Sequence, residues 1–221
     1  MIFPELKNKK FGQVNLNLEG ELWLKKNRKK YLNISNPLLT PSICQEMVDR
    51  INQKNSIDYS FGGWMENRNI FLKGTYLDKY EKYLHLGVDI NVPHGTSVAC
   101  DLPAKVIRID DDYPEESGWG PRVIVRLLNI PTILIYAHLD KDIICKVGDV
   151  LKSGQVFAKI GSSSHNGGWF PHLHIQSVEP KYYDNLLKID IRDLDGYGLP
   201  SEKETLSIIF KDQMKFIILI S

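Results

Sequence analysis

Residues 85–99 read His85-Leu-Gly-Val-Asp-Ile-Asn-Val-Pro-His-Gly-Thr-Ser-Val-Ala99, and this stretch indicates both a strand and a chemical site. His85 and Asp89 are four positions apart, so their side chains share one face of a strand and also one face of a helix. Gly87 between them and the alternation of Ile90-Asn91-Val92 favour the strand. An imidazole and a carboxylate are therefore predicted to lie together on one face of a sheet.

Three more histidines lie in two short segments further along, Tyr136-Ala-His138-Leu and Pro171-His172-Leu-His174. On a strand, His172 and His174 point to the same face and are about 6.6 Å apart, so both look into one groove. Two imidazoles and a carboxylate can hold Zn²⁺ and leave one position open for water, as a catalytic site requires. Two further histidines then remain to handle protons. The sequence predicts a zinc hydrolase.

Between residues 85 and 174 the chain resembles the lysostaphin-like (LytM-type) zinc endopeptidases, which cut peptide cross-links of bacterial cell walls. Order, spacing and glycine placement all match, so the likeness is more specific than one short motif. The matching segments are His85-Leu-Gly-Val-Asp89-Ile, Pro93-His-Gly95-Thr96-Ser-Val98-Ala99, Tyr136-Ala-His138-Leu, Val147-Gly148-Asp-Val150-Leu-Lys-Ser-Gly154-Gln155, Ile160-Gly161-Ser and Pro171-His172-Leu-His174.

The resemblance implies a role for each of the five residues. It makes His85, Asp89 and His174 the ligands of one Zn²⁺ per chain. It makes His138 and His172 the catalytic pair that orients the water and stabilises the transition state, and leaves open which of them is the base. The implied activity is that of a zinc metalloendopeptidase. The implied partner is a peptide, most simply a peptidoglycan cross-link or stem peptide.

The chain departs from the family pattern around the groove. Ile175 and Gln176 stand where the family commonly has an aromatic residue and a Glu, and Gly120-Pro121-Arg122 replaces a usual Gly-Asn. The loop Asn166-Gly-Gly-Trp-Phe-Pro171 lacks the usual Thr-Gly. None of these changes removes a ligand, so they concern the substrate rather than the metal.

Two features upstream of the first ligand also bear on the substrate. Residues Gly62-Gly-Trp-Met-Glu-Asn-Arg68 are similar to the lead-in of zinc-peptidase domains fused to phosphotransferase or aminotransferase modules, which with Gln176 favours a specialised, non-wall substrate. Some family members hold the oxyanion with an upstream tyrosine. The candidates for that role are Tyr76, Tyr80 and Tyr83.

Many short strands without long intervening helices predict a mainly β fold, an antiparallel β sandwich or saddle with a partly helical N-terminal appendage. We expect an appendage at 1–75, a catalytic domain at 76–180 and an extension at 181–221 that ends in an apolar strand. The appendage is expected to hold a helix from Thr40 to about Asn52, followed by a loop at Ser60–Trp64. Predicted strands are Ser97–Cys100, Ala104–Ile109, Arg122–Leu128, Thr132–Ala137 and Val156–Ile160, with a tight hairpin connection at Asn129-Ile-Pro131.

Composition bears on three further properties: the class of partner, the presence of disulfides and the location of the protein. The 221 residues carry 28 basic and 27 acidic side chains, a net charge of +1, so bulk charge does not indicate a nucleic-acid partner. The run of basic residues between Lys25 and Lys30 is interpreted as a solvated segment. The sequence has three cysteines, an odd number, and they are widely spaced, at Cys44, Cys100 and Cys145. This argues against a disulfide framework. Neither a signal peptide nor a membrane span is recognisable, so we expect a cytoplasmic protein or export by another route.

Two rival functions use the same residues. A catalytically silent, peptide-binding relative would normally lose ligands, and this chain keeps all five residues. A non-haem iron oxygenase also uses two histidines and a carboxylate. Such triads usually have one residue between the first histidine and the carboxylate, whereas three residues separate His85 from Asp89, and the additional His138/His172 pair suits hydrolysis better. The remaining histidines, His94 and His165, lie in turn-like and polar sequence and are interpreted as structural.

Overall fold

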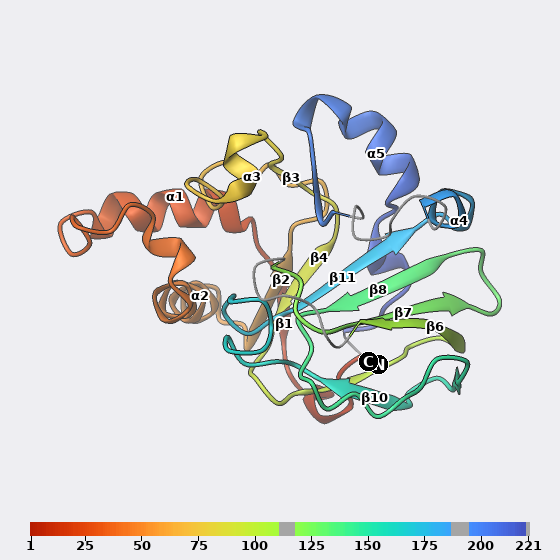
Figure 1. Ribbon diagram of the computed structural model, residues 1–221. Helices are drawn as coiled ribbons and strands as arrows, with labels where there is room; N and C mark the ends of the chain where they lie inside the picture. The colour runs from red at the N-terminus through yellow and green to blue at the C-terminus, as the bar shows by residue number, and fades with distance from the viewer. Residues whose placement is uncertain (111–117, 187–194, 220–221) are drawn as a thin grey trace.

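A computed structural model of the chain describes residues 1–110, 118–186 and 195–219, and its largest element is one eight-stranded mixed sheet (Figure 1). The strand order is β1-β2-β4-β11-β8-β7-β6-β9. Every pair is antiparallel except β1 with β2, which is parallel. The strands are β1 (Phe11–Gln13), β2 (Tyr59–Gly62), β4 (Val88–Asn91), β6 (Ala104–Asp110), β7 (Arg122–Leu127), β8 (Ile133–Ala137), β9 (Val150–Leu151) and β11 (Leu173–Val178).

Two small antiparallel sheets flank the large one. The first pairs β5 (Ser97–Ala99) with β10 (Val156–Lys159), and the second pairs β3 (Leu84–His85) with β12 (Tyr197–Gly198). In the second, Tyr197 is the register partner of His85. A segment from the end of the chain is thereby fixed beside the first predicted ligand.

Apolar side chains cover both faces of the large sheet. Along β8, Leu134 and Tyr136 enter one hydrophobic cluster, whereas Ile133, Ile135 and Ala137 enter another on the opposite face. All five residues are buried. A strand covered on both faces is apolar throughout rather than alternating, which accounts for the sequence of β8. The central strands β8 and β11 are therefore a rigid base for the residues at their ends.

The helices lie at two sides of the sheet. In Figure 1, α1 (Leu16–Asn27) and α2 (Pro41–Asn55) lie beside the β1 and β2 edge, and α4 (Pro180–Leu186) and α5 (Lys203–Ile209) lie near one end of β11. The one-turn helix α3 (Tyr76–Lys79) precedes β3. Short 3₁₀ turns occur at Pro4–Leu6, Pro37–Leu39, Pro200–Glu202 and Gln213–Lys215. Within the described ranges, no helix has the length and apolar character that crossing a bilayer requires.

The structure confirms the mainly β class and most predicted elements. The five predicted strands are β5, β6, β7, β8 and β10, and the hairpin connection joins β7 to β8. The predicted helix is α2, with Pro41 in its first turn and Ser56 as a left-handed cap at φ 52°. Lys25 and Lys26 lie in the last turn of α1, a helix that was not predicted. Both side chains are exposed, as a solvated segment requires.

Two local predictions were wrong. Residues 59–62 form β2 instead of a loop, because the edge of β4 supplies partners for Ser60 and Gly62 at Asn91 and Asp89. The predicted apolar strand at the end of the chain does not form within its described residues: between β12 and residue 219 the chain holds helices, helical turns and irregular backbone. The side chains of Ile217 and Leu219 still pack in the hydrophobic core, although their backbone is not paired as a strand. The division at 75 and 180 stays a prediction, but β1 and β2 extend the large sheet from the first part.

Candidate metal and catalytic site

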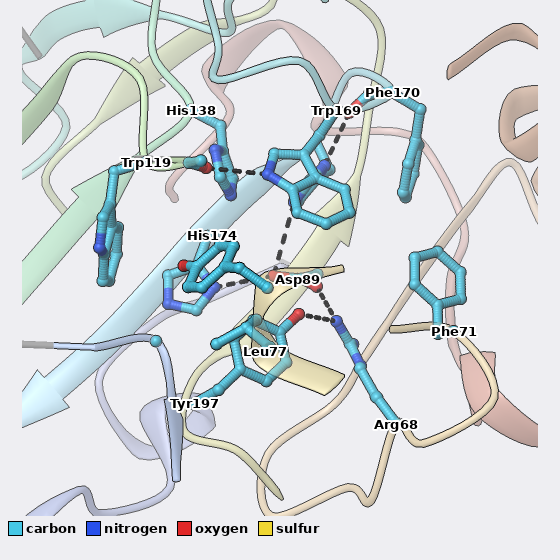
Figure 2. A pocket seen from close by; sticks show the side chains of 14 residues that line it. Arg68, Phe71, Leu77, Asp89, Trp119, His138, Trp169, Phe170, His174 and Tyr197 are labelled. Carbon is cyan, nitrogen blue, oxygen red and sulfur yellow. Dashed lines mark hydrogen bonds and ion pairs between the residues drawn. The ribbon is translucent and has the colours of Figure 1, made fainter. Parts of the chain in front are cut away.

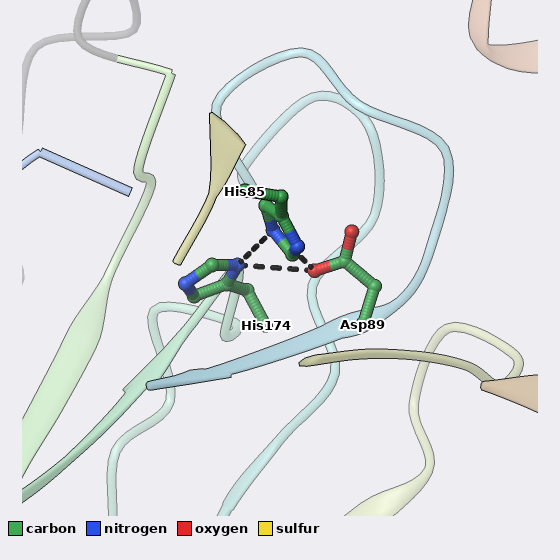
Figure 3. Close-up of side chains that lie close together, drawn as sticks. All are labelled: His85, Asp89 and His174. Carbon is green, nitrogen blue, oxygen red and sulfur yellow. Dashed lines mark hydrogen bonds and ion pairs between the residues drawn. The ribbon is translucent and has the colours of Figure 1, made fainter. Parts of the chain in front are cut away.

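His85, Asp89 and His174 converge on one buried point (Figure 3). They come from β3, β4 and β11, and Asp89 is the register partner of His174. His85 Nε2 lies 3.1 Å from His174 Nδ1, and Asp89 Oδ1 lies 3.0 Å from His174 Nδ1 and 3.4 Å from His85 Nε2. Ligand atoms about 2.0 Å from a tetrahedral zinc are about 3.3 Å apart, so the three atoms fit that ion. None of the three residues is more than 3% exposed.

Hydrogen bonds outside the cluster fix how each imidazole presents its lone pair. The His85 Nδ1–H donates to the Gly63 carbonyl at 3.0 Å, which leaves Nε2 as the acceptor. The His174 Nε2–H donates to Gln176 Oε1 at 3.2 Å, which leaves Nδ1 facing the cluster. Such outer partners set the tautomer and orientation of metal-binding histidines. Gln176, a departure from the family sequence, thus supplies the oxygen that accepts from the predicted ligand His174.

His138 and His172 lie beside this cluster as a pair. Their ring centroids are 4.4 Å apart, and His172 Nε2 is 3.7 Å from Asp89 Oδ1. Each donates its Nδ1–H to a backbone carbonyl: His138 to Asn166 at 2.8 Å and His172 to Phe170 at 2.7 Å. In both rings Nε2 is therefore the nitrogen able to accept a proton.

The backbone at His138 is in the left-handed region, with φ 62°. Its N–H donates to the Trp119 carbonyl at 3.1 Å, and its carbonyl accepts from the Gly161 N–H at 2.9 Å. Such conformations cost about 1–3 kcal/mol and persist where the surroundings fix them. With this backbone conformation the chain leaves the ladder at the end of β8, and the His138 imidazole lies beside that of His172.

Burial shifts the pKa values of three of the histidines at the site. It lowers the pKa of His85 to about 3, that of His138 well below its ordinary value, and that of His172 in the same direction. Burial alone would raise the pKa of Asp89, but His85 and the Arg68 guanidinium outweigh it and hold that pKa well below the usual range. At neutral pH these histidines are neutral beside an ionised carboxylate, the state in which such groups bind a metal.

The metal-free protein is therefore expected to lose stability as the pH falls below about 6.5. His85, His138 and His172 titrate near 6.5 in the unfolded chain, but burial lowers their pKa values in the folded protein. Below pH 6.5 the unfolded chain takes up protons that the folded protein does not. Each histidine then lowers the free energy of unfolding by about 1.4 kcal/mol per pH unit until its folded pKa is reached. Urea denaturation at several pH values measures the slope; a flat profile below pH 6.5 would contradict the expectation.

The structure brings together all five site residues predicted from the sequence. The two remaining histidines of the chain lie outside this cluster. The His94 and His165 side chains are 53% and 41% exposed and lie near Asp140. Of the three tyrosine candidates, only Tyr76 lines the pocket at the site. Tyr80 is exposed, and the Tyr83 hydroxyl donates to Asp78.

Sequence reasoning missed two residues of this pocket, Arg68 and Tyr197 (Figure 2). The Arg68 guanidinium contacts Asp89, and the Tyr197 ring lies 4.9 Å from that of His85. Arg68 stands at the end of the lead-in segment already noted, whereas no local pattern marks Tyr197. Aromatic side chains, among them Phe71, Trp119 and Trp169, also line the pocket.

Comparison with protein families gives a match to the central part of the chain. Residues 83–185 match the model of Peptidase family M23. The match covers somewhat less than half of the chain and confirms the resemblance to the LytM-type, lysostaphin-like peptidases found in the sequence. No curated protein matches the chain.

Solved structures give similarities of limited extent. The catalytic domain of the antimicrobial peptidase lysostaphin from Staphylococcus simulans is 22% identical with a TM-score of 0.43, over 61% of this chain and 79% of that one. A zinc-containing peptidase from Vibrio cholerae is 27% identical with a TM-score of 0.37. That match covers 43% of this chain but only 27% of the Vibrio protein. The catalytic domain of the prophage-encoded M23 protein EnpA from Enterococcus faecalis is 24% identical with a TM-score of 0.37, over 44% and 69% of the two chains.

Proposed function

We propose that the chain is a zinc-dependent endopeptidase that hydrolyses peptide bonds of peptidoglycan, in cross-links or stem peptides. The observation that carries this proposal is the convergence of three ligand atoms, one each from His85, Asp89 and His174, with their lone pairs directed at one point. A zinc ion there would lower the pKa of a bound water to about 7 and polarise the scissile carbonyl. His138 and His172, which lie beside the cluster, would accept that water's proton.

The fixed tautomers restrict how the pair handles that proton. Because His138 and His172 each use Nδ1–H on a backbone carbonyl, neither neutral ring can donate a hydrogen bond from Nε2. One Nε2 must first accept the proton of the attacking water. The imidazolium so formed can then donate from Nε2 to the oxyanion or to the leaving amine. The low pKa that burial gives both rings favours passing the proton on rather than keeping it.

Digestion of purified peptidoglycan tests the proposal. Protein loaded with Zn²⁺ is incubated with the cell-wall material, and new peptide termini are identified by mass spectrometry. We expect new amino and carboxyl termini within the peptide portion, lost on treatment with a chelator and restored by added zinc. Release of sugar fragments alone, or cleavage that persists after complete chelation, would contradict the proposal.

A further inference from the structure

Arg68 is buried against the predicted ligand Asp89. Its side chain is only 2% exposed, and Nη1 donates to Asp89 Oδ2 at 2.5 Å and to the Tyr197 hydroxyl oxygen at 3.3 Å (Figure 2). Arg68 precedes the family segment 83–185 and Tyr197 follows it. The two residues therefore reach the site from parts of the chain that the family model does not cover.

The first part of the chain holds Arg68 in place. Glu66 Oε1 lies 3.8 Å from Arg68 Nε and also accepts the Asn17 N–H, in the first turn of α1, at 2.7 Å. Gly63 makes room for the guanidinium: a Cβ there would overlap Arg68 Nη2 and lie 2.6 Å from His85 Nδ1. With φ at 110°, residue 63 also has a backbone conformation that favours glycine. A chain of contacts thus runs from α1 to the carboxylate of Asp89.

Because of this contact, the two carboxylate oxygens of Asp89 have different partners. Oδ2 is taken by Arg68, whereas Oδ1 faces His85 and His174. A carboxylate with one oxygen held by a charged donor cannot rotate freely, so a single oxygen is presented to a metal. The guanidinium also supplies a countercharge for a carboxylate that lies buried among neutral imidazoles.

We propose that Arg68, braced by Glu66 and Tyr197, is a positioning residue that aims Asp89 Oδ1 at the metal. The segment before the family domain thereby completes the metal site. This inference rests on the proposed function only as far as the metal is concerned, since it requires zinc at the cluster but no particular substrate.

The test is the affinity for zinc alone, measured by competition with a chromophoric chelator and without peptide. Arg68→Met keeps a long side chain but removes the charge and the donors, and we expect it to bind zinc about 10- to 100-fold more weakly. Arg68→Lys should fall between it and the wild type. Arg126→Met is the matched control, since Arg126 makes a 2.7 Å ion pair with Asp184 that is largely exposed; its zinc affinity should equal that of the wild type.

Far-UV circular dichroism shows whether Arg68→Met folds without metal. If it does not fold, two milder variants test the inference instead. Tyr197→Phe and Glu66→Gln each remove one brace and nearly preserve volume, and both should weaken zinc binding by several-fold. Wild-type affinity in a folded Arg68→Met, or in both brace variants, would overturn the inference. Failure of the wild type to bind zinc would overturn both proposals. Zinc binding without peptide cleavage would overturn only the proposed function.

Discussion

Replacing Asp89 with alanine is expected to abolish zinc binding and to reduce peptide hydrolysis to background. Asp89 Oδ1 is within 3.4 Å of both ligand nitrogens, so its loss leaves two imidazoles that cannot complete the predicted site. Elemental analysis after gel filtration measures the bound metal, and an assay on peptidoglycan peptides measures turnover. Asp89→Asn is the companion variant, because it keeps the volume and one oxygen; it should bind zinc weakly.

The same variant should also destabilise the metal-free protein. Asp89→Ala leaves the buried guanidinium of Arg68 without its carboxylate, and breaking a buried ion pair in this way costs about 3–5 kcal/mol. Asp184→Ala breaks an exposed pair instead and should change the free energy of unfolding by less than about 0.5 kcal/mol. Urea denaturation in the presence of a chelator compares the two. Zinc binding at wild-type affinity by Asp89→Ala would remove this residue from the ligand set.

Local sequence patterns and the family resemblance together identified the five site residues, and the role of His138 came from the resemblance alone. An even spacing puts His172 and His174 on one face of the chain entering β11. The same rule predicted a single strand for His85 and Asp89, and that was wrong: His85 ends β3 in a small sheet, whereas Asp89 lies in β4 of the large sheet, and the two side chains still converge. The structure adds that Asp89 and His174 are partners across β4 and β11, which spacing alone does not state. The strands around them were predictable for a related reason, since short apolar runs between turn residues need no information from distant parts of the chain.

Arg68 and Tyr197 depend on pairings between segments far apart in the sequence. β2 adds to β4 and β12 adds to β3, and these pairings help to bring the neighbouring residues to the site. A bridge between Asn67 and Leu84 and the hydrogen bond from the Arg68 N–H to the Tyr83 carbonyl then fix Arg68 beside β3. The glycines at 62 and 63 predict a loop locally, but the edge of β4 overrides that preference. The same pairing shows why residues 1–75 cannot be removed as a simple appendage. A chain that starts at residue 70 lacks Arg68 as well as β1 and β2.

Replacing His138 is expected to separate metal binding from catalysis. His138→Ala should keep wild-type zinc affinity, since His138 is not within the ligand cluster, and should lower kcat by about 10²- to 10⁴-fold, the range for losing a general acid or base. His138→Asn is the better-matched variant, because asparagine tolerates the positive φ at this position better than most residues.

His94→Ala is the control for this experiment, since His94 is a half-exposed histidine near Asp140 and outside the pocket. Its kcat and its zinc affinity should both match the wild type. If zinc-loaded His138→Ala and His138→Asn both turned over at near-normal rates, His172 alone would have to accept the water's proton and deliver it. The close contact between the two rings, 4.4 Å between centroids, would then serve packing rather than catalysis.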